Sequence, residues 1–217
     1  MLRRIFVNME TQGTKNIRIP ENIHCLALNY PGVGSNDAEM PLYFVKSRQA
    51  YCTSGAQVHY PDGSNKVWTE VELGIVLARA GVGIGKLEAE DYIAGYVVCA
   101  DISCENIHLR DHHLGFSKSR AGFCPCSGSV IFLPLEQAMQ LDIFTEINGK
   151  TTQTGNTASM LLNPAEIISY LSSLTRLEAG DLILTGTPPG YQNNMLKHGD
   201  KVHHCIIGLG EVFYEII

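Results

Sequence analysis

The sequence has little of what a nucleic-acid-binding or membrane-embedded protein needs. Lysine and arginine number 16 against 22 aspartates and glutamates, a formal net charge of −6, so we expect no basic surface for nucleic acid or an anionic membrane. No apolar run reaches the ~20 residues that a membrane-spanning helix requires. Residues 1–10 start basic but soon become polar and acidic, so they lack a signal peptide's apolar stretch. These absences predict a cytoplasmic protein without nucleic-acid or membrane partners.

A disulfide framework is missing as well. The seven cysteines are odd in number and scattered through apolar segments, so we expect reduced thiols. Internal repeats, charge blocks and low-complexity tracts are also absent, while 45% of the residues are hydrophobic, which is enough for a large core. We therefore expect one domain over residues 1–217, with residues 1–20 as an N-terminal extension.

The apolar patterns predict a mainly β (α+β) fold with a few short helices. The 21 glycines suit a turn-rich β protein better than a helical bundle. Residues 67–77 alternate at first and then become continuously apolar, which is typical of a strand whose far end is covered on both faces. Further strands are expected over residues 21–30, 43–46, 96–101, 142–148, 182–185, 202–207 and 211–217, the last two as a closing hairpin.

One helix has clear start signals. Asn163 can cap it, Pro164 fits its first turn, and Glu166 completes a spacing like that of a capping box. The apolar stripe that this helix would bury consists of Ile167, Ile168, Leu171 and Leu174.

Two acids, Glu70 and Glu72, lie two residues apart in the predicted strand 67–77. A period of two puts both carboxylates on one face, with Cα atoms ~7 Å apart, a good geometry for two oxygen ligands of one hard cation. A solvated acidic face is the commoner meaning of a bare Glu-x-Glu pattern. Here the strand continues into the apolar run 74–78, and acids that enter a core without a partner are costly, so the pattern favours a bound cation.

Asp101 directly follows the apolar residues 97–100 and is expected to end their strand. Alone it would pass as an ordinary turn residue at a strand end. Together with Glu70 and Glu72 it makes a set of three carboxylates. Oxygen ligands without histidine or thiolate suit Mg²⁺, Mn²⁺ or Ca²⁺ better than zinc.

Two lysines and one turn are candidates to bind substrate beside such a cation. Lys46 and Lys118 are surface charges in the commoner interpretation, but an ammonium near a metal centre can bind a carboxylate or stabilise an enolate. The turn with Gly186 and Thr187 offers backbone N–H groups and a hydroxyl after an apolar strand. An ordinary strand-exit turn would have the same sequence.

A structural zinc site is the rival interpretation. Its candidate ligands are Cys104, His108, His112, His113, Cys124 and Cys126. His108 and His112 are four residues apart and would share a helical face. No Cys-x-x-Cys framework accompanies them, so a loop whose histidines face substrate or solvent is the preferred interpretation.

The motifs also occur in the order found in one family. They are residues 67–73, 94–101, 118–119 followed by 123–125, 148–150, 153–157 and 180–188. In these motifs, over a match from about Asn22 to the C-terminus, the chain resembles the fumarylacetoacetate hydrolase family. In size it is similar to the small, single-domain branch that includes acylpyruvases, oxaloacetate decarboxylases and the isomerases of aromatic-acid degradation.

The resemblance implies a mixed β-sandwich roll that forms a homodimer and holds Mg²⁺ or Mn²⁺. By the family pattern Glu70, Glu72 and Asp101 are the metal ligands. Lys118 and Thr187 line the substrate pocket, with Lys46 nearby. The family's substrates are small 2-oxo acids with a further carbonyl or carboxylate, and the metal stabilises the enolate that forms when a C–C bond breaks or a proton moves.

The chain departs from the family where hydrolases activate water. They usually follow the Asn-Tyr pair with a lid helix that carries a histidine and a glutamate, whereas residues 31–36 have neither and contain two glycines. Glu105-Asn106 stand where many relatives have Arg-Asp, and Arg120 replaces a common aromatic residue. Candidates for the missing catalytic roles are His108, Asp37, Glu39 and His24.

Metal-dependent hydrolysis of a C–C bond in a 2,4-diketo acid of the acylpyruvate or fumarylpyruvate type is the leading hypothesis. A decarboxylase or an isomerase (tautomerase) of a related 2-oxo acid is the alternative, and it needs less from a lid base. The competing class is a metal-binding protein with degraded catalysis that only binds ligands. Complete loss of acids and bases from the lid segment would favour that class, but Asp37 and Glu39 are present there and support the enzyme hypothesis.

Overall fold

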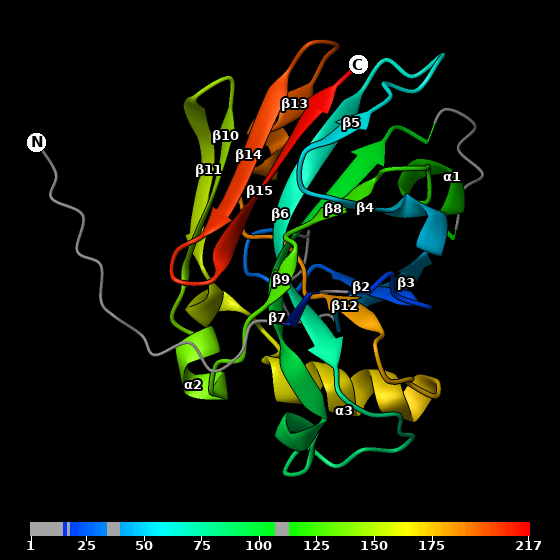
Figure 1. Cartoon of the computed structure of the whole chain (residues 1–217), viewed down its shortest axis with the longest axis vertical. Coiled ribbons are helices and arrows are strands. Elements are labelled where there is room, and N and C mark those ends of the chain that lie inside the picture. The colour runs from blue at the N-terminus through cyan, green and yellow to red at the C-terminus, as the bar shows by residue number, and fades with distance from the viewer. Residues whose placement is uncertain (1–14, 17, 34–39, 107–112) are drawn as a thin grey trace, which may run out of the picture.

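Nearly all of the strands belong to two curled β-sheets (Figure 1). The computed structural model describes residues 15–16, 18–33, 40–106 and 113–217. The eight-stranded sheet has the order β3 (Leu42–Lys46), β2 (Ile23–Ala27), β12 (Leu182–Leu184), β6 (Val67–Leu77), β7 (Ile93–Cys104), β8 (Cys124–Cys126) and β4 (Tyr51–Thr53), with β13 (Met195–Leu196) paired to β6. The predicted mainly β fold is confirmed.

A second sheet of five strands stands beside the first (Figure 1). Its order is β11 (Lys150–Asn156), β10 (Asp142–Ile147), β14 (Lys201–Ile206), β15 (Gly210–Ile216) and β5 (Ala56–Val58). A further small pair joins β1 (Lys15–Asn16), within the predicted N-terminal extension, to β9 (Ser129–Val130). That the chain is a single domain stays a prediction.

Short helices connect the strands. They are α1 (Gly115–Lys118), α2 (Leu135–Ala138), α3 (Pro164–Leu174) and the 3₁₀ turns η1 (Arg48–Ala50), η2 (Ala89–Tyr92), η3 (Thr157–Ser159) and η4 (Tyr191–Asn193). Helix α3 begins as predicted, with a complete capping box between Asn163 and Glu166. The predicted stripe is correct for its first three residues, which are buried, but Leu174 at the last turn is 55% exposed. No helix in the described part of the chain is both long and apolar enough to cross a bilayer.

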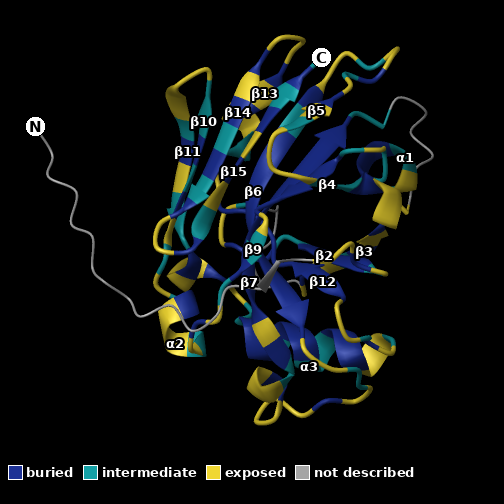
Figure 2. Ribbon diagram, viewed as in Figure 1, coloured by how far each residue is buried: buried dark blue, intermediate teal, exposed yellow. Residues whose placement is uncertain are grey.

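The two central strands, β6 and β7, are buried at all but one residue each (Figure 2). Strand β6 has the predicted bounds. Strand β7 is longer than predicted, so the expectation that Asp101 ends it is wrong. The strand continues to Cys104 because its last residues pair with the start of β6, Cys104 opposite Val67.

The closing hairpin is confirmed, and the predicted strand 142–148 ends in a turn at Asn148 and Gly149. Asn148 and Gly149 both have positive φ, 53° and 77°, as expected for a tight turn between antiparallel strands. Strand β2 is shorter than the predicted 21–30, and β12 ends at Leu184. Strand β12 forms antiparallel pairs with β6 and parallel pairs with β2, and so joins segments from opposite ends of the chain.

Candidate metal and substrate site

Three carboxylates meet on one face of the central strand pair. Glu70 of β6 lies directly opposite Asp101 of β7 in the ladder, and Glu72 follows two residues on. One ligand oxygen from each lies within 4.8 Å of the others. Val71 and Leu73 point to the other face, into the core. Period-two alternation on β6 and the register with β7 therefore bring the predicted set together.

The cluster is buried, and this perturbs its protonation. Glu72 and Asp101 are each 1% exposed and Glu70 is 9% exposed. Burial, with the charges of Asp101 and Glu70, holds the pKa of Glu72 well above its usual range. Burial also raises the pKa of Glu70, although Lys118 and a hydrogen bond from the Trp68 indole at 2.7 Å work against it. Facing carboxylates repel each other, so the cluster needs positive charge.

Lys118 supplies part of that charge. Its ammonium lies 2.7 Å from Asp101 Oδ2 and 3.4 Å from Glu70 Oε2, and 5.0 Å from the centre of the Phe44 ring. Burial would lower the pKa of Lys118, but the two carboxylates outweigh it and raise the pKa above its usual value. The side chain therefore stays protonated at neutral pH and acts as a cation.

Lys46 contacts the cluster from the far side of the curled sheet. Strand β3 is four strand spacings from β7, ~19 Å in a flat sheet, which is far beyond one lysine side chain. Yet its ammonium lies 2.6 Å from Asp101 Oδ1. It also donates to the carbonyls of Ile102, Lys118 and Phe123 at 2.6–3.0 Å. The curl of the sheet makes these contacts possible. The three carbonyls use every N–H of the ammonium, so its contact with Asp101 Oδ1, an atom without a hydrogen-bond partner among the described residues, is one of charge.

The charges present fit a divalent cation. Burial alone would raise the pKa of Asp101, but the two lysines lower it, so this carboxylate is ionised at neutral pH. Three carboxylates against two ammonium groups leave one negative charge in excess if all are ionised. An all-oxygen donor set of this kind suits hard cations such as Mg²⁺, Mn²⁺ and Ca²⁺. Glu70, Glu72 and Asp101 are thus the residues that would hold the ion.

The turn after β12 closes one side of the cluster. Gly186 donates its backbone N–H to Glu72 Oε2 at 2.5 Å. The glycine has φ +92°, and a Cβ there would lie 3.1 Å from the Asn29 Cβ and 3.2 Å from the Leu26 carbonyl oxygen. A side chain at this position would therefore push the turn away from Glu72. This explains why glycine precedes Thr187.

Thr187 is oriented by Gln153, a residue that sequence reasoning missed except as part of a family motif. The Gln153 Nε2 contacts the Pro188 carbonyl at 2.6 Å, and a carbonyl oxygen only accepts, so this atom must be the amide nitrogen. Its second hydrogen goes to Thr187 Oγ1 at 3.0 Å. The Thr187 hydroxyl accepts this bond and keeps its own hydrogen for another acceptor.

The same amide fixes a buried network between the sheets. Gln153 Oε1 accepts from Thr145 Oγ1 at 3.2 Å, so Thr145 must in turn accept from His204 Nδ1 at 2.9 Å. His204 then carries its proton on Nδ1, and its Nε2 faces Thr69 and Tyr214 at 2.9 and 3.0 Å. Burial lowers the pKa of His204 to about 3, so the ring is neutral. Thr69 precedes Glu70, and the network therefore supports β6 at the site.

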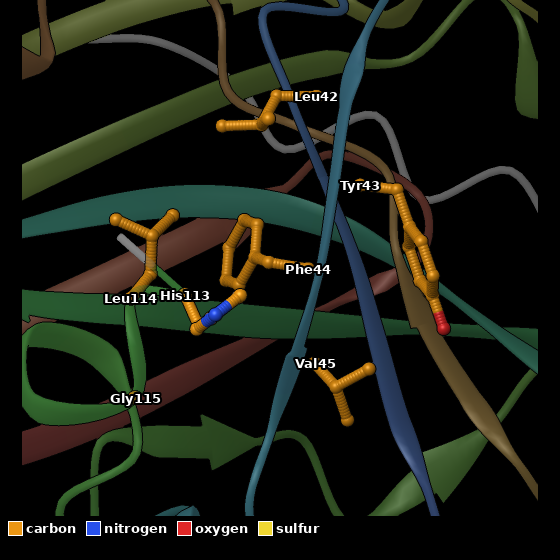
Figure 3. Close-up of a pocket in the computed structure, with 7 residues that line it drawn as sticks. All are labelled: Leu42, Tyr43, Phe44, Val45, His113, Leu114 and Gly115. Carbon is orange, nitrogen blue, oxygen red and sulfur yellow. The ribbon is translucent and has the colours of Figure 1, made fainter. Parts of the chain in front are cut away.

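An apolar hollow lies beside Lys118. It has a volume of about 430 Å³ and is lined by Leu42, Tyr43, Phe44, Val45, His113, Leu114 and Gly115 (Figure 3). Phe44 and Leu114 approach each other across it (Figure 3). The Phe44 ring, which lines the hollow, also contacts the Lys118 ammonium.

The remaining predicted residues are not brought to the cluster by the described parts of the chain. His108, Asp37 and Glu39 lie outside the described residues. His24 bonds to Tyr43 at 2.9 Å and contacts Asp181 at 3.3 Å. Within the described residues, two groups of three possible ligands gather, the carboxylate cluster and His203, Cys205 and Glu211. Neither contains a cysteine or histidine of the rival zinc interpretation. All seven cysteines are free thiols.

Comparisons with known proteins agree with the motifs. The sequence model described as "Fumarylacetoacetate (FAA) hydrolase C-terminal" matches residues 22–216. The chain belongs to the fumarylacetoacetate hydrolase family. A curated relative, the mitochondrial oxaloacetate tautomerase FAHD1 of Rattus norvegicus, is 32% identical over 204 residues, 90% of this chain and 91% of that protein.

Solved structures share the family fold. The 2-hydroxyhepta-2,4-diene-1,7-dioate isomerase of Mycobacterium marinum matches 92% of this chain and 75% of its own, with a TM-score of 0.82 and 27% identity. The fumarylpyruvate hydrolase of Pseudomonas aeruginosa, solved with Mn²⁺ and pyruvate, matches 99% of both chains with a TM-score of 0.83 at 22% identity. The chain is therefore an enzyme of a family whose members are tautomerases, isomerases and hydrolases.

Proposed function

We propose that this chain is a divalent-metal-dependent tautomerase or isomerase of a small 2-oxo dicarboxylic acid such as oxaloacetate. The observation that carries the proposal is the buried set Glu70, Glu72 and Asp101 with the Lys118 ammonium against it. Relatives at 30–32% identity support the reaction class, since those matched over nine-tenths of the chain include the mitochondrial oxaloacetate tautomerases of rat and human.

Each residue of the site has its own role in this chemistry. Mg²⁺ or Mn²⁺ held by the three carboxylates would supply a Lewis acid for the keto-acid oxygens. Lys118 keeps its proton and stabilises the negative oxygen of the enolate by charge and hydrogen bonding. Thr187 has a free hydroxyl hydrogen and donates it to a substrate oxygen. Lys46, fully engaged with Asp101 and three carbonyls, holds the Asp101 carboxylate in place and acts on substrate through its charge.

Hydrolysis of a 2,4-diketo acid is the second candidate. It needs a group that activates water, and within the described residues no histidine contacts the carboxylates or the two lysines. His108 stays our prediction for the group that moves a proton in either reaction. A change of His108 to alanine is expected to slow turnover while metal binding is retained.

A substrate panel separates the candidates. Oxaloacetate, an acylpyruvate and fumarylpyruvate are assayed with Mg²⁺, with Mn²⁺ and with EDTA. We expect metal-dependent conversion between enol and keto oxaloacetate, followed by the change in ultraviolet absorbance, without release of pyruvate. Pyruvate formed faster from the acylpyruvate would favour the hydrolase, pyruvate from oxaloacetate a decarboxylase, and no turnover with intact metal binding the ligand-binding alternative.

Lys118 provides the mechanistic test. One preorganised charge donor is worth roughly 3–4 kcal/mol in comparable sites, so Lys118→Ala and Lys118→Met should lower kcat by about 10²–10³-fold with metal binding retained. Lys150→Met, at an exposed lysine of β11, is the matched control. Near-native kinetics in both Lys118 variants would remove this residue from the mechanism.

A further inference from the structure

A second cluster of possible ligands lies on the outer face of the five-stranded sheet. His203 and Cys205 are two residues apart on β14, and Glu211 lies directly opposite Cys205 on β15. The nitrogen, sulfur and oxygen atoms of these residues lie within 4.8 Å of one another. His204, between the first two, points into the core, so alternation directs His203 and Cys205 outward.

His203 is held rigidly in this cluster. Its ring stacks on Phe213 with centroids 4.2 Å apart and an interplanar angle of 10°, and it meets the Phe144 ring edge to face at 5.6 Å. The imidazole therefore has a fixed plane on the surface of the sheet. A ligand group held in this way loses little conformational entropy on binding.

Both ring nitrogens face a carboxylate. Nδ1 lies 3.2 Å from Glu146 Oε2, and Nε2 lies 3.2 Å from Glu211 Oε2. A neutral imidazole has one N–H, so it can donate to one of these carboxylates but not to both. The other contact would set a nitrogen lone pair against a carboxylate oxygen. Either a second proton on the ring or a cation between the two groups removes that repulsion.

The ligand set favours the cation. We propose that His203 Nε2, the Cys205 thiolate and the Glu211 carboxylate form a second metal site for Zn²⁺ or a similar borderline-soft ion. Glu146 then accepts the hydrogen of Nδ1, the arrangement that commonly orients a metal-binding histidine. Nitrogen and sulfur ligands select ions that the all-oxygen cluster does not. Three protein ligands leave a fourth tetrahedral position for water.

Co²⁺ distinguishes the two sites because only one has sulfur. The protein is treated with EDTA, dialysed and titrated with Co²⁺. We expect a thiolate-to-cobalt charge-transfer band and intense tetrahedral d–d bands that saturate at one equivalent. Zn²⁺ should abolish these bands, whereas Mg²⁺ in excess should leave them unchanged. In Glu72→Gln the bands should persist, so a failure of the carboxylate cluster to bind metal leaves this test intact.

Three variants complete the test. Cys205→Ser should lose the charge-transfer band, and Cys52→Ser, at another half-buried thiol, should keep it. Glu146→Gln should keep the band but weaken Co²⁺ binding by about 10–100-fold, as is usual for the partner of a metal-binding histidine. Circular dichroism and a cooperative melt verify the fold of each variant.

Two results would overturn the proposal. One is the absence of the thiolate band from the wild-type protein at a small excess of Co²⁺. The other is a band that survives in Cys205→Ser, which would place the metal on a different thiol.

Discussion

Replacing Glu72 by glutamine should stabilise the metal-free protein and abolish its stabilisation by metal. Glu72 is 1% exposed, and its nearest neighbours in the site include two further carboxylates. Glutamine keeps the shape of the side chain, and its Oε1 can still accept from the Gly186 N–H, as the carboxylate does. The substitution therefore removes one charge and little else.

The size of the effect follows from the distances. Charges no more than 4.8 Å apart repel by roughly 3 kcal/mol or more at an effective dielectric constant of about 20. Glu72 has two such neighbours, Glu70 and Asp101, and Lys118 offsets about one of these repulsions. We expect Glu72→Gln to gain about 1–3 kcal/mol of unfolding free energy in EDTA at neutral pH.

The pH dependence has a definite sign. The pKa of Glu72 is raised in the folded state, so its ionised form opposes folding, and this penalty grows as pH rises through the folded pKa. The advantage of the glutamine variant should therefore shrink as pH falls, since the wild-type carboxyl then takes up its proton.

Urea denaturation with EDTA and with Mn²⁺ measures both effects. Saturation at 100 times Kd should add about 2.7 kcal/mol to the wild type and nothing to the variant. Glu88→Gln, at an exposed acid, is the control and should stay within about 0.5 kcal/mol of the wild type under both conditions. A metal-free Glu72→Gln less stable than the wild type, or one still stabilised by Mn²⁺, would refute the reasoning.

Four further predictions concern the rest of the molecule. Thr187→Val should lower kcat/KM by about 10–100-fold, because a hydrogen bond to a charged group is worth about 1.5–3 kcal/mol. Thr187→Ser should stay near the wild type, and equal losses in both variants would show that the hydroxyl has no role. The pKa of the neutral His204 is lowered to about 3, so the free energy of unfolding should fall by about 1.4 kcal/mol per pH unit as pH drops below ~6.5. In urea titrations His204→Gln should remove this pH dependence, and His59→Gln, at an exposed histidine, should not. Asn163→Ala should cost about 1 kcal/mol of unfolding free energy through loss of the α3 cap, and an unchanged midpoint would contradict this. Light scattering should report a homodimer, and a mass near 23.8 kDa at micromolar concentration would argue for a monomer.

The sequence predicted those parts of the site that depend on local pattern. Alternation along β6 was enough to place Glu70 and Glu72 on one face, and the apolar run after them correctly indicated burial. Asp101 was misplaced at a strand end, because a lone acid among apolar residues looks like a terminus. Its position inside β7 is tolerable only because Lys46 and Lys118 neutralise it, and both come from distant segments.

Neither the curl of the sheet nor the buried network could be predicted from local sequence pattern. No periodicity in β3 indicates that Lys46 lies against β7, because that contact depends on the curvature accumulated over the intervening strands. Likewise, His203 and His204 are adjacent in sequence, and only the fold decides which one enters the core. The position of the proton on the His204 ring is known only because Gln153 and Thr145 fix it.

The place of β12 has a consequence for how the chain folds. This strand inserts between β2 and β6, so neither of those strands reaches its final neighbour until residues 182–184 have left the ribosome. The turn that donates to Glu72 comes directly after it. Until then the nascent chain holds two open sheet edges and an unfinished acidic cluster, and open edges invite pairing with other chains. Closure by contacts between distant segments slows folding, and the ability to hold an ion should be acquired in one step, once β12 and the turn after it are in place.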